Sequence, residues 1–214
     1  MTKGVEAPSR REVRREQHHE LSRSQLLDAA ERVFGEKGFH DATLNEIAEL
    51  AEFSVGSVYS FFDGKEDLFS QVFVRRGDEF MPGMRAILDQ AGSSSDKLHR
   101  LVDFQVGFFR DHRHFGRLFL RYANVALLSE PGELDGSIAE NYRESMRLQT
   151  ELIANGQHAG EFRPGDPTVL AHLFSGLIAS YQALDPSVVS DDPTAADRLP
   201  LGDLHQMIAG AFGA

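Results

Sequence analysis

The sequence predicts an all-α protein. Apolar residues recur at steps of three and four along most of the 214 residues, whereas the alternation that is typical of strands is scarce. Two of these periodic stretches open with Thr or Asp and carry Glu three residues later, which is the capping box of a helix start. With 41% hydrophobic and 26% charged residues, the chain has the composition of an ordinary globular protein.

Composition also excludes several classes of protein. The chain has no cysteine, so disulfides and cysteine-based metal sites are excluded. No apolar run approaches the roughly 20 residues that span a bilayer, and the N-terminus lacks the apolar segment of a secretory signal. We therefore expect a cytoplasmic protein with no membrane partner. The net charge of −11 does not indicate nucleic-acid binding, although an acidic total permits a local basic surface.

The first two predicted helices cover residues 24–37 and the segment that starts at Thr43. Glycines at positions 35 and 38 mark the end of the first helix, and Thr43 forms a capping box with Glu46 at the start of the second. The apolar stripe of the first helix consists of Leu26, Ala30, Val33 and Phe34, and that of the second of Leu44, Ile47, Ala48 and Ala51.

A third short helix is predicted from Ser54, its N-cap, to Phe62. A fourth follows the capping box of Asp63 and Glu66. The inward face of the third helix consists of Val58, Phe61 and Phe62, and that of the fourth of Leu68, Phe69, Val72 and Phe73. Helices this short are unstable alone in water, so they must pack against the helix at 24–37. Three helices with a tight turn form a helix-turn-helix, whose second helix enters the major groove of DNA.

Residues 23–69 resemble the DNA-binding domain of the TetR family of transcriptional regulators. The similar stretches are "LLDAAERVFGEKGFHDATLNEIAELA", "SVGSVYSFF" and "KEDLF". The resemblance implies a helix-turn-helix DNA-binding domain at 23–69 and a helical effector-binding and dimerisation domain at 70–214, preceded by a basic N-terminal arm at 1–22. It further implies a homodimer on a palindromic double-stranded DNA operator, released by a small-molecule effector. Repression rather than activation is implied only by the habit of the family.

The candidate DNA-contacting residues lie around the third helix. Gly56 permits a close approach of the backbone to DNA, and hydroxyl groups supply phosphate contacts. The resemblance assigns Lys65 to a phosphate clamp. The full set is Thr43, Ser54, Val55, Gly56, Ser57, Tyr59, Ser60 and Lys65. A purely structural interpretation stays open, because Thr43 and Ser54 cap helices whether or not DNA is bound and Tyr59 would also cover the edge of the core.

Two positions depart from the family pattern. Many relatives have Lys or Arg where this chain has Val55, and Gly in the turn where it has Glu52. Val55 cannot neutralise a phosphate but is able to contact a thymine methyl, and Glu52 adds a negative charge near DNA. The two departures predict weak, salt-sensitive binding or an unusual operator. The arm at 1–22 would compensate by following the DNA backbone or entering a minor groove, unless it is a solvated tail.

From residue 70 onward the predicted helices are longer and rich in aromatic residues. The sequence has sixteen Phe, four Tyr and no Trp. Aromatic faces between helices are typical of an apolar ligand pocket, and the resemblance favours a hydrophobic effector there. The candidate ligand-binding residues are Phe104, Phe108, Phe119, Tyr122, Tyr142 and Phe174. The alternative is that the same residues are ordinary core, because aromatic stripes at helical spacing usually are.

The last two predicted helices are candidates for a dimer interface. The helix that begins near Pro167 carries one apolar row at Val169, Leu173, Leu177 and Leu184. After a polar loop at 185–200, the final helix is apolar at Leu204, Met207, Ile208, Ala211 and Phe212. Two such helices from each of two chains would form a four-helix interface, or else they complete the core of the monomer.

Chemistry other than DNA binding finds little support. His112 and His114 are two residues apart, which is not the spacing of a helical metal pair. No set of ionisable residues converges as an active site would require, so we expect no enzyme, no metal site and no cofactor. Two alternatives stay open, namely a helix-turn-helix protein that acts through protein contacts without binding DNA, and an all-helical enzyme.

Overall fold

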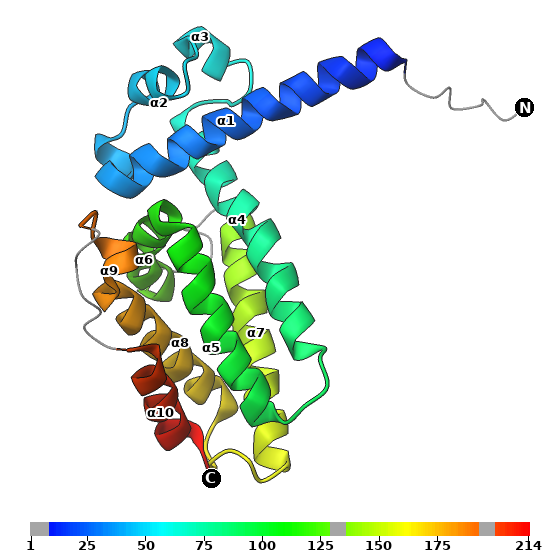
Figure 1. Cartoon of the computed structure of the whole chain (residues 1–214), viewed down its shortest axis with the longest axis vertical. Helices are drawn as coiled ribbons and strands as arrows, with labels where there is room; N and C mark the ends of the chain where they lie inside the picture. The colour runs from blue at the N-terminus through cyan, green and yellow to red at the C-terminus, as the bar shows by residue number, and fades with distance from the viewer. Residues whose placement is uncertain (1–8, 129–135, 193–199) are drawn as a thin grey trace, which may run out of the picture. The chain divides into compact units, whose positions relative to one another are not determined.

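The computed structural model describes residues 9–128, 136–192 and 200–214, and every regular element in these ranges is a helix. The predicted all-α class is therefore confirmed. The elements in chain order (Figure 1) are α1 (Arg10–Asp41), α2 (Leu44–Leu50), α3 (Val55–Val58), α4 (Lys65–Leu88), α5 (Ser94–Asp111), α6 (Arg113–Leu128), α7 (Gly136–His158), α8 (Pro167–Leu184), α9 (Pro186–Val189) and α10 (Leu201–Phe212). The chain divides into two compact units, Met1–Val72 and Phe73–Ala214, and α4 contributes to both.

Helix α1 is much longer than the helix expected at 24–37. It begins after Ser9, which forms a capping box with Glu12, so residues 10–22 of the expected basic arm are helical. Residues 1–8 of that arm lie outside the described part of the chain. At the other end, Gly38 has a φ of 82° and a non-helical ψ, which interrupts the helix where a glycine stop was expected.

The core of the first unit forms along the middle of α1. The stripe predicted there is buried, and so are Ile47 and Ala48 of α2 and Val58 of α3. Three aromatic rings close this core, since Phe69 packs edge-on against both Phe34 and Phe39. Short helices thus gain their stability from tertiary packing rather than from their own length.

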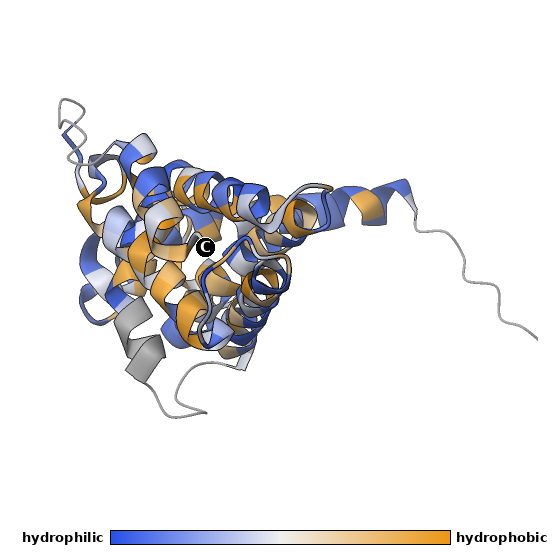
Figure 2. Cartoon of the chain, turned by 90° about the horizontal axis from the view of Figure 1, so that it is seen from below, coloured by the Kyte–Doolittle hydropathy of each residue, from blue (hydrophilic) through white to orange (hydrophobic). Residues whose placement is uncertain are grey.

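The second unit buries a separate core between α4, α5, α7, α8 and α10. Its members include Met81, Met84, Leu101, Phe174 and Ile208. Most helices carry hydrophilic and hydrophobic bands side by side, as amphipathic helices do (Figure 2). Two glycines are needed for close packing here: a Cβ on Gly83 would lie 2.5 Å from the Phe104 ring, and a Cβ on Gly156 would lie 2.1 Å from Phe162.

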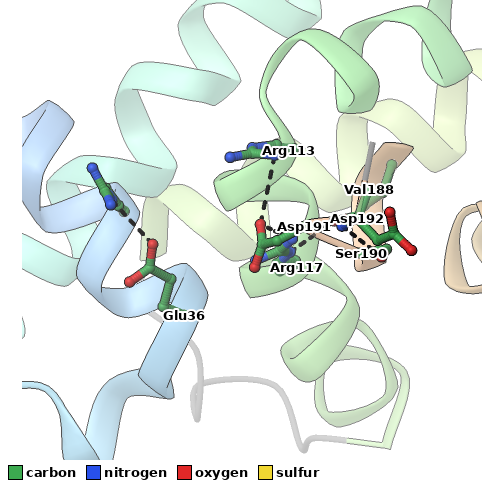
Figure 3. A network of polar contacts seen from close by, with 8 residues as sticks. Glu36, Arg113, Arg117, Val188, Ser190, Asp191 and Asp192 are labelled. Carbon is green, nitrogen blue, oxygen red and sulfur yellow. Dashed lines mark hydrogen bonds and ion pairs between the residues drawn. The ribbon is translucent and has the colours of Figure 1, made fainter. Parts of the chain in front are cut away.

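An arginine of α6 fixes the segment after α9. Arg117 donates to both carboxylate oxygens of Asp191, at 2.7 and 3.2 Å, and its Nε donates to the Val188 carbonyl at 2.8 Å (Figure 3). Arg113 lies 3.5 Å from the same carboxylate. The hydrogen bond from Arg117 lowers the pKa of Asp191. This segment was expected to be a polar loop at 185–200, but it contains the short helix α9, and its residues 193–199 lie outside the description.

Helix α7, Gly136–His158, begins directly after residues 129–135, which lie outside the described ranges. Among the helices that the structure describes, none is long and apolar enough to cross a membrane.

Candidate nucleic-acid interface

The turn between α2 and α3 is made by a residue in an unusual conformation. Glu52 has a φ of 60°, the left-handed region that favours glycine. The chain then reverses, and the Phe53 amide donates to the Ala48 carbonyl at 2.8 Å. A glycine would adopt this positive φ without strain, which explains why glycine is common at this turn position in relatives. In this chain the position is occupied by an exposed glutamate.

Both short helices are capped as predicted. Thr43 Oγ1 accepts from the Glu46 amide at 3.3 Å, and the Glu46 carboxylate accepts from the Thr43 amide at 3.1 Å. The Thr43 hydroxyl also donates to that carboxylate. Lys37 pairs with Glu46 as well, and this contact is the first cause that lowers the Glu46 pKa. The capping box expected at the start of α4 differs, because Asp67 rather than Glu66 accepts from the Asp63 amide.

Helix α3 is shorter than the expected segment 54–62. Regular helix covers only Val55–Val58. Hydrogen-bonded turns follow it as far as Phe62, whose amide donates to the Val58 carbonyl at 3.0 Å. Val58 and Phe62 are buried as predicted. Phe61 is only partly buried and lies 4.7 Å from the His19 ring of α1, measured between ring centroids. Both ends of the segment from Ser54 to Phe62 are therefore fixed, the first by the Ser54 cap and the second by aromatic packing.

The outward side of α3 is open. Gly56 is exposed, and a Cβ placed there would meet only Ser54 Oγ, at 3.8 Å, which is ordinary contact. The fold of the chain therefore does not need a glycine at this position. Tyr59 is 60% exposed, so its ring contributes little to the core. A missing side chain beside an exposed aromatic one leaves room for a partner surface to approach.

The candidate hydroxyls differ in whether they have a proton left to donate. Ser60 uses its proton on the Ser57 carbonyl at 2.6 Å, and Thr43 uses its proton on Glu46. Ser54 and Ser57 share one proton between their oxygens at 2.8 Å, so the pair keeps a second proton for another acceptor. Tyr59 has no described hydrogen-bond partner and keeps its proton too. The free donors therefore lie at Tyr59 and at the Ser54–Ser57 pair.

Lys65 has a structural contact that the sequence interpretation did not anticipate. Its ammonium donates to the carbonyls of Phe39 and Ala42 at 2.9 and 3.0 Å, with the His40 carbonyl at 3.4 Å. It also lies 4.5 Å from the centre of the Phe39 ring. A cation at these carbonyls complements the negative end of α1 and uses all three ammonium protons.

Sequence reasoning also missed the junction of α1 with the end of α3. Arg23 lies over the Phe62 ring at 5.3 Å and donates to the Gln71 side chain at 2.6 Å, and His19 stacks on Phe61. A signal for the longer α1 was present, because Ser9 and Glu12 have the spacing of a capping box. These contacts are all between residues of the first unit.

The candidate ligand-binding residues of the second unit differ in the residues that they contact. Phe104, Phe108, Phe119 and Tyr122 belong to one aromatic cluster. The members of this cluster are Phe73, Phe80, Phe104, Phe108, Phe109, Phe115, Phe119 and Tyr122, joined by ring centroids 5.1–6.5 Å apart. Phe174 instead packs against Phe212 of α10, and Tyr142 packs with Met146 and Ala171. Phe104 and Phe174 nevertheless pack in the same hydrophobic core, and Leu170 contacts both this core and the group that contains Tyr142, so the assignment of all six residues to one ligand site stays a prediction.

Among the buried polar atoms of this unit that have no hydrogen-bond partner in the described residues are Gln105 Nε2 and the hydroxyl of Tyr142. Burial raises the pKa of Tyr142, so its hydroxyl keeps its proton and is a donor. Near Gln105 the interior is polar: Arg110 donates to Asp185 at 2.7 Å and to the Tyr181 hydroxyl at 3.0 Å. Buried donors without a partner are uncommon and are typical of positions that a ligand or water satisfies.

Comparisons with known proteins agree with this geometry. Residues 26–72 match the family described as bacterial regulatory proteins, tetR family. The chain is 28% identical over 153 residues to the HTH-type transcriptional repressor KstR2 of Mycolicibacterium smegmatis, covering 71% of this chain and 73% of that protein. It is 24% identical over 144 residues to the fatty acid metabolism regulator protein of Bacillus subtilis, covering 66% and 71%.

A solved structure extends the likeness beyond the matched segment. The ketosteroid transcriptional regulator KstR2 of Mycobacterium tuberculosis has a TM-score of 0.72 at 20% identity, and the match covers 90% of this chain and 95% of that one. The family segment contains the whole of α2, the turn and α3. The capped helix-turn-helix, the relatives and the shared fold agree: residues 26–72 carry the segment of the TetR family of bacterial transcriptional regulators, and the chain as a whole has the fold of such regulators.

Proposed function

We propose that this regulator is a repressor that binds a palindromic operator as a homodimer and is released by a small hydrophobic effector. The observation that carries the DNA-binding part is the open position at Gly56. Glycine in a helix costs roughly 1 kcal/mol relative to alanine, and no residue that the structure describes occupies the space of the missing side chain. The glycine is explained if DNA backbone or a base edge comes within contact distance of α3.

The contacts we propose follow from which groups have protons to donate. Tyr59 and the Ser54–Ser57 pair contact phosphate, and Val55 packs on a thymine methyl. Ser60 and Thr43 are able to contact DNA only as acceptors or by exchanging the hydrogen bonds that they already make. Lys65 holds the end of α1, and so positions α2 without touching phosphate itself.

The proposed dimer uses the exposed apolar sides of α8 and α10. Val169 and Leu173 of α8 and Met207 of α10 are at least half exposed, and Leu184 is nearly so. Gly176 and Ser180 lie on the same open side of α8 and permit a close helix contact. Apolar side chains at this spacing are costly to leave in water, and a second copy of the same helices would cover them. Such a dimer presents two α3 helices to two operator half-sites.

The proposed effector binds in the second unit, beside the aromatic cluster defined above. Phe73 and Phe80 of α4 belong to this cluster, and the same helix begins at Lys65 in the first unit. An effector that moves α4 therefore changes the DNA-binding unit through the chain itself. The relatives are named for fatty acid metabolism and for ketosteroids, which supports a lipid-like effector whose polar group meets a buried donor such as the Tyr142 hydroxyl.

The experiment that tests the DNA-binding proposal compares the wild-type chain with Gly56→Ala. Genomic fragments selected by the wild-type protein supply the operator, and fluorescence anisotropy measures affinity. We expect Gly56→Ala to be at least as stable as the wild type and to lose DNA affinity tenfold or more, because its methyl group fits the free protein but not the complex. Selection of no specific fragment by the wild type would favour the alternative, a helix-turn-helix protein that acts through protein contacts, to which the exposed Glu52 beside α3 is better suited.

A further inference from the structure

The N-terminal third of α1 separates its charges by side. Between Arg10 and Ser22 the helix carries four arginines, two histidines and three glutamates, and its residues up to Leu21 are exposed. Arg11, Arg15, His18 and Ser22 recur at steps of four, three and four, which is one side of a helix. Arg10 and Arg14 lie beside this row, whereas Glu12, Glu16 and Glu20 form a separate row. We call Arg10, Arg11, Arg14, Arg15 and His18 the basic side of α1.

The basic side has few partners inside the protein. Arg14 donates to the Arg10 carbonyl of its own helix at 3.2 Å. No described carboxylate pairs with Arg11 or Arg15. By contrast, Arg117 of α6 is paired with Asp191, and Arg147 of α7 is paired with Glu144 and Glu151. Unpaired, exposed guanidinium groups aligned along a helix fit a row of phosphates.

The place where this extension leaves the folded unit is fixed beside α3. His19 stacks on Phe61 and Arg23 lies over Phe62, and both phenylalanines belong to the hydrogen-bonded turns that follow α3. From His19 to Arg10 the helix advances about 13 Å, at 1.5 Å per residue. Phosphates on one strand recur about every 3.4 Å along the duplex axis, so the extension is long enough to pass more than two of them. All of these residues lie in the first unit.

We propose that the basic side of α1 is a second DNA contact, in which Arg11 and Arg15 bind backbone phosphates next to the half-site read by α3. This proposal rests on the proposed function, because it needs DNA at α3. It replaces the expected flexible arm with a rigid helix, so little conformational entropy is lost when the arginines bind. Phosphate contacts carry no sequence information, and the extension therefore raises affinity for every duplex by a similar factor. It also supplies the cations that Val55 does not.

The test compares two double variants that change the charge by two units in opposite directions. Arg11→Gln/Arg15→Gln removes two cations from the basic side, and Glu16→Gln/Glu20→Gln removes two anions from the other row while keeping the Ser9–Glu12 capping box. Each is titrated by fluorescence anisotropy against a selected operator duplex and a scrambled duplex of the same composition, between about 50 and 300 mM salt. Circular dichroism confirms that both variants keep the helix.

We expect the arginine variant to bind both duplexes at least about a hundredfold more weakly at 150 mM salt. The slope of log K against log salt should become shallower by about 3.6 for a dimer that loses four contacts. The glutamate variant should keep the wild-type slope. Unchanged binding by the arginine variant, a loss confined to the operator, or equal and opposite changes in the two variants would each overturn the proposal. Failure of the wild type to select any operator would instead refute the proposed function itself.

Discussion

Lys65 offers a direct choice between a structural and a DNA-binding role. Lys65→Met keeps most of the aliphatic stem and removes the ammonium that bridges three carbonyls at the end of α1. A hydrogen bond to a charged group contributes about 1.5–3 kcal/mol, and a cation near a helix C-terminus about 0.3–1 kcal/mol. Because the three carbonyl contacts share one cation and are not additive, we expect the free energy of unfolding of the first unit to fall by about 2–3 kcal/mol.

The assay is urea denaturation followed by far-ultraviolet circular dichroism, with Lys37→Met as the matched control. The Lys37 ammonium pairs with Glu46 on the surface, where 46% of its side chain is exposed, so its loss should change stability by less than about 1 kcal/mol. DNA titrations below the unfolding transition complete the test. The reasoning is refuted if Lys65→Met is as stable as the wild type but binds DNA with a salt slope shallower by about 2 for a dimer, because the lysine would then be bound to phosphate.

Three other perturbations test separate parts of the structure. Glu52→Gly should raise the free energy of unfolding by up to about 1 kcal/mol in urea denaturation, because the φ of 60° strains any residue with a Cβ; a less stable variant would contradict this. Leu173→Lys should shift the protein toward monomer in analytical ultracentrifugation, and an intact dimer would exclude α8 from the interface. Burial, and to a smaller extent the neighbouring His205, lowers the pKa of His99, so the unfolded chain binds a proton at this residue more readily than the folded one and the free energy of unfolding should fall as the pH drops below 6.5. His99→Gln should weaken this pH dependence, and a variant with the same pH profile as the wild type would contradict the role of His99.

The sequence predicted the fold well wherever one local rule decided the outcome. The caps at Thr43 and Ser54 depend only on residues three positions apart, and the buried stripe of α1 follows from helical periodicity. Prediction failed where two signals competed. The polar and charged residues of the α1 extension are typical of a solvated arm, whereas the Ser9–Glu12 capping box indicates a helix start, and the capping box decides the structure.

The candidate site could be located from the sequence but not divided by role. Lys65 and Tyr59 both looked like phosphate ligands, and only the structure shows that the Lys65 ammonium is occupied by carbonyls brought from residues 39–42. A contact across more than twenty residues of sequence has no local signal. The aromatic candidates behaved similarly, because periodicity places Phe104 and Phe174 toward the same core without saying that their rings pack on different aromatic partners, Phe80 and Phe212.

The short helix α3 is held in place at its two ends. Its own backbone hydrogen bonds are few, so it depends on the Ser54 cap at the start and on the buried Phe62 at the end, and these two anchors fix the residues between them. The proposed DNA contact would leave the cap intact, because Ser54 Oγ accepts from the Ser57 amide with a lone pair and the two hydroxyls need only one of their two protons for each other. A phosphate that takes the second proton therefore adds a hydrogen bond without removing one. Ser60 lacks this property, since a phosphate would have to take the proton that it gives to the Ser57 carbonyl, and so its contribution to affinity should be the smaller of the two.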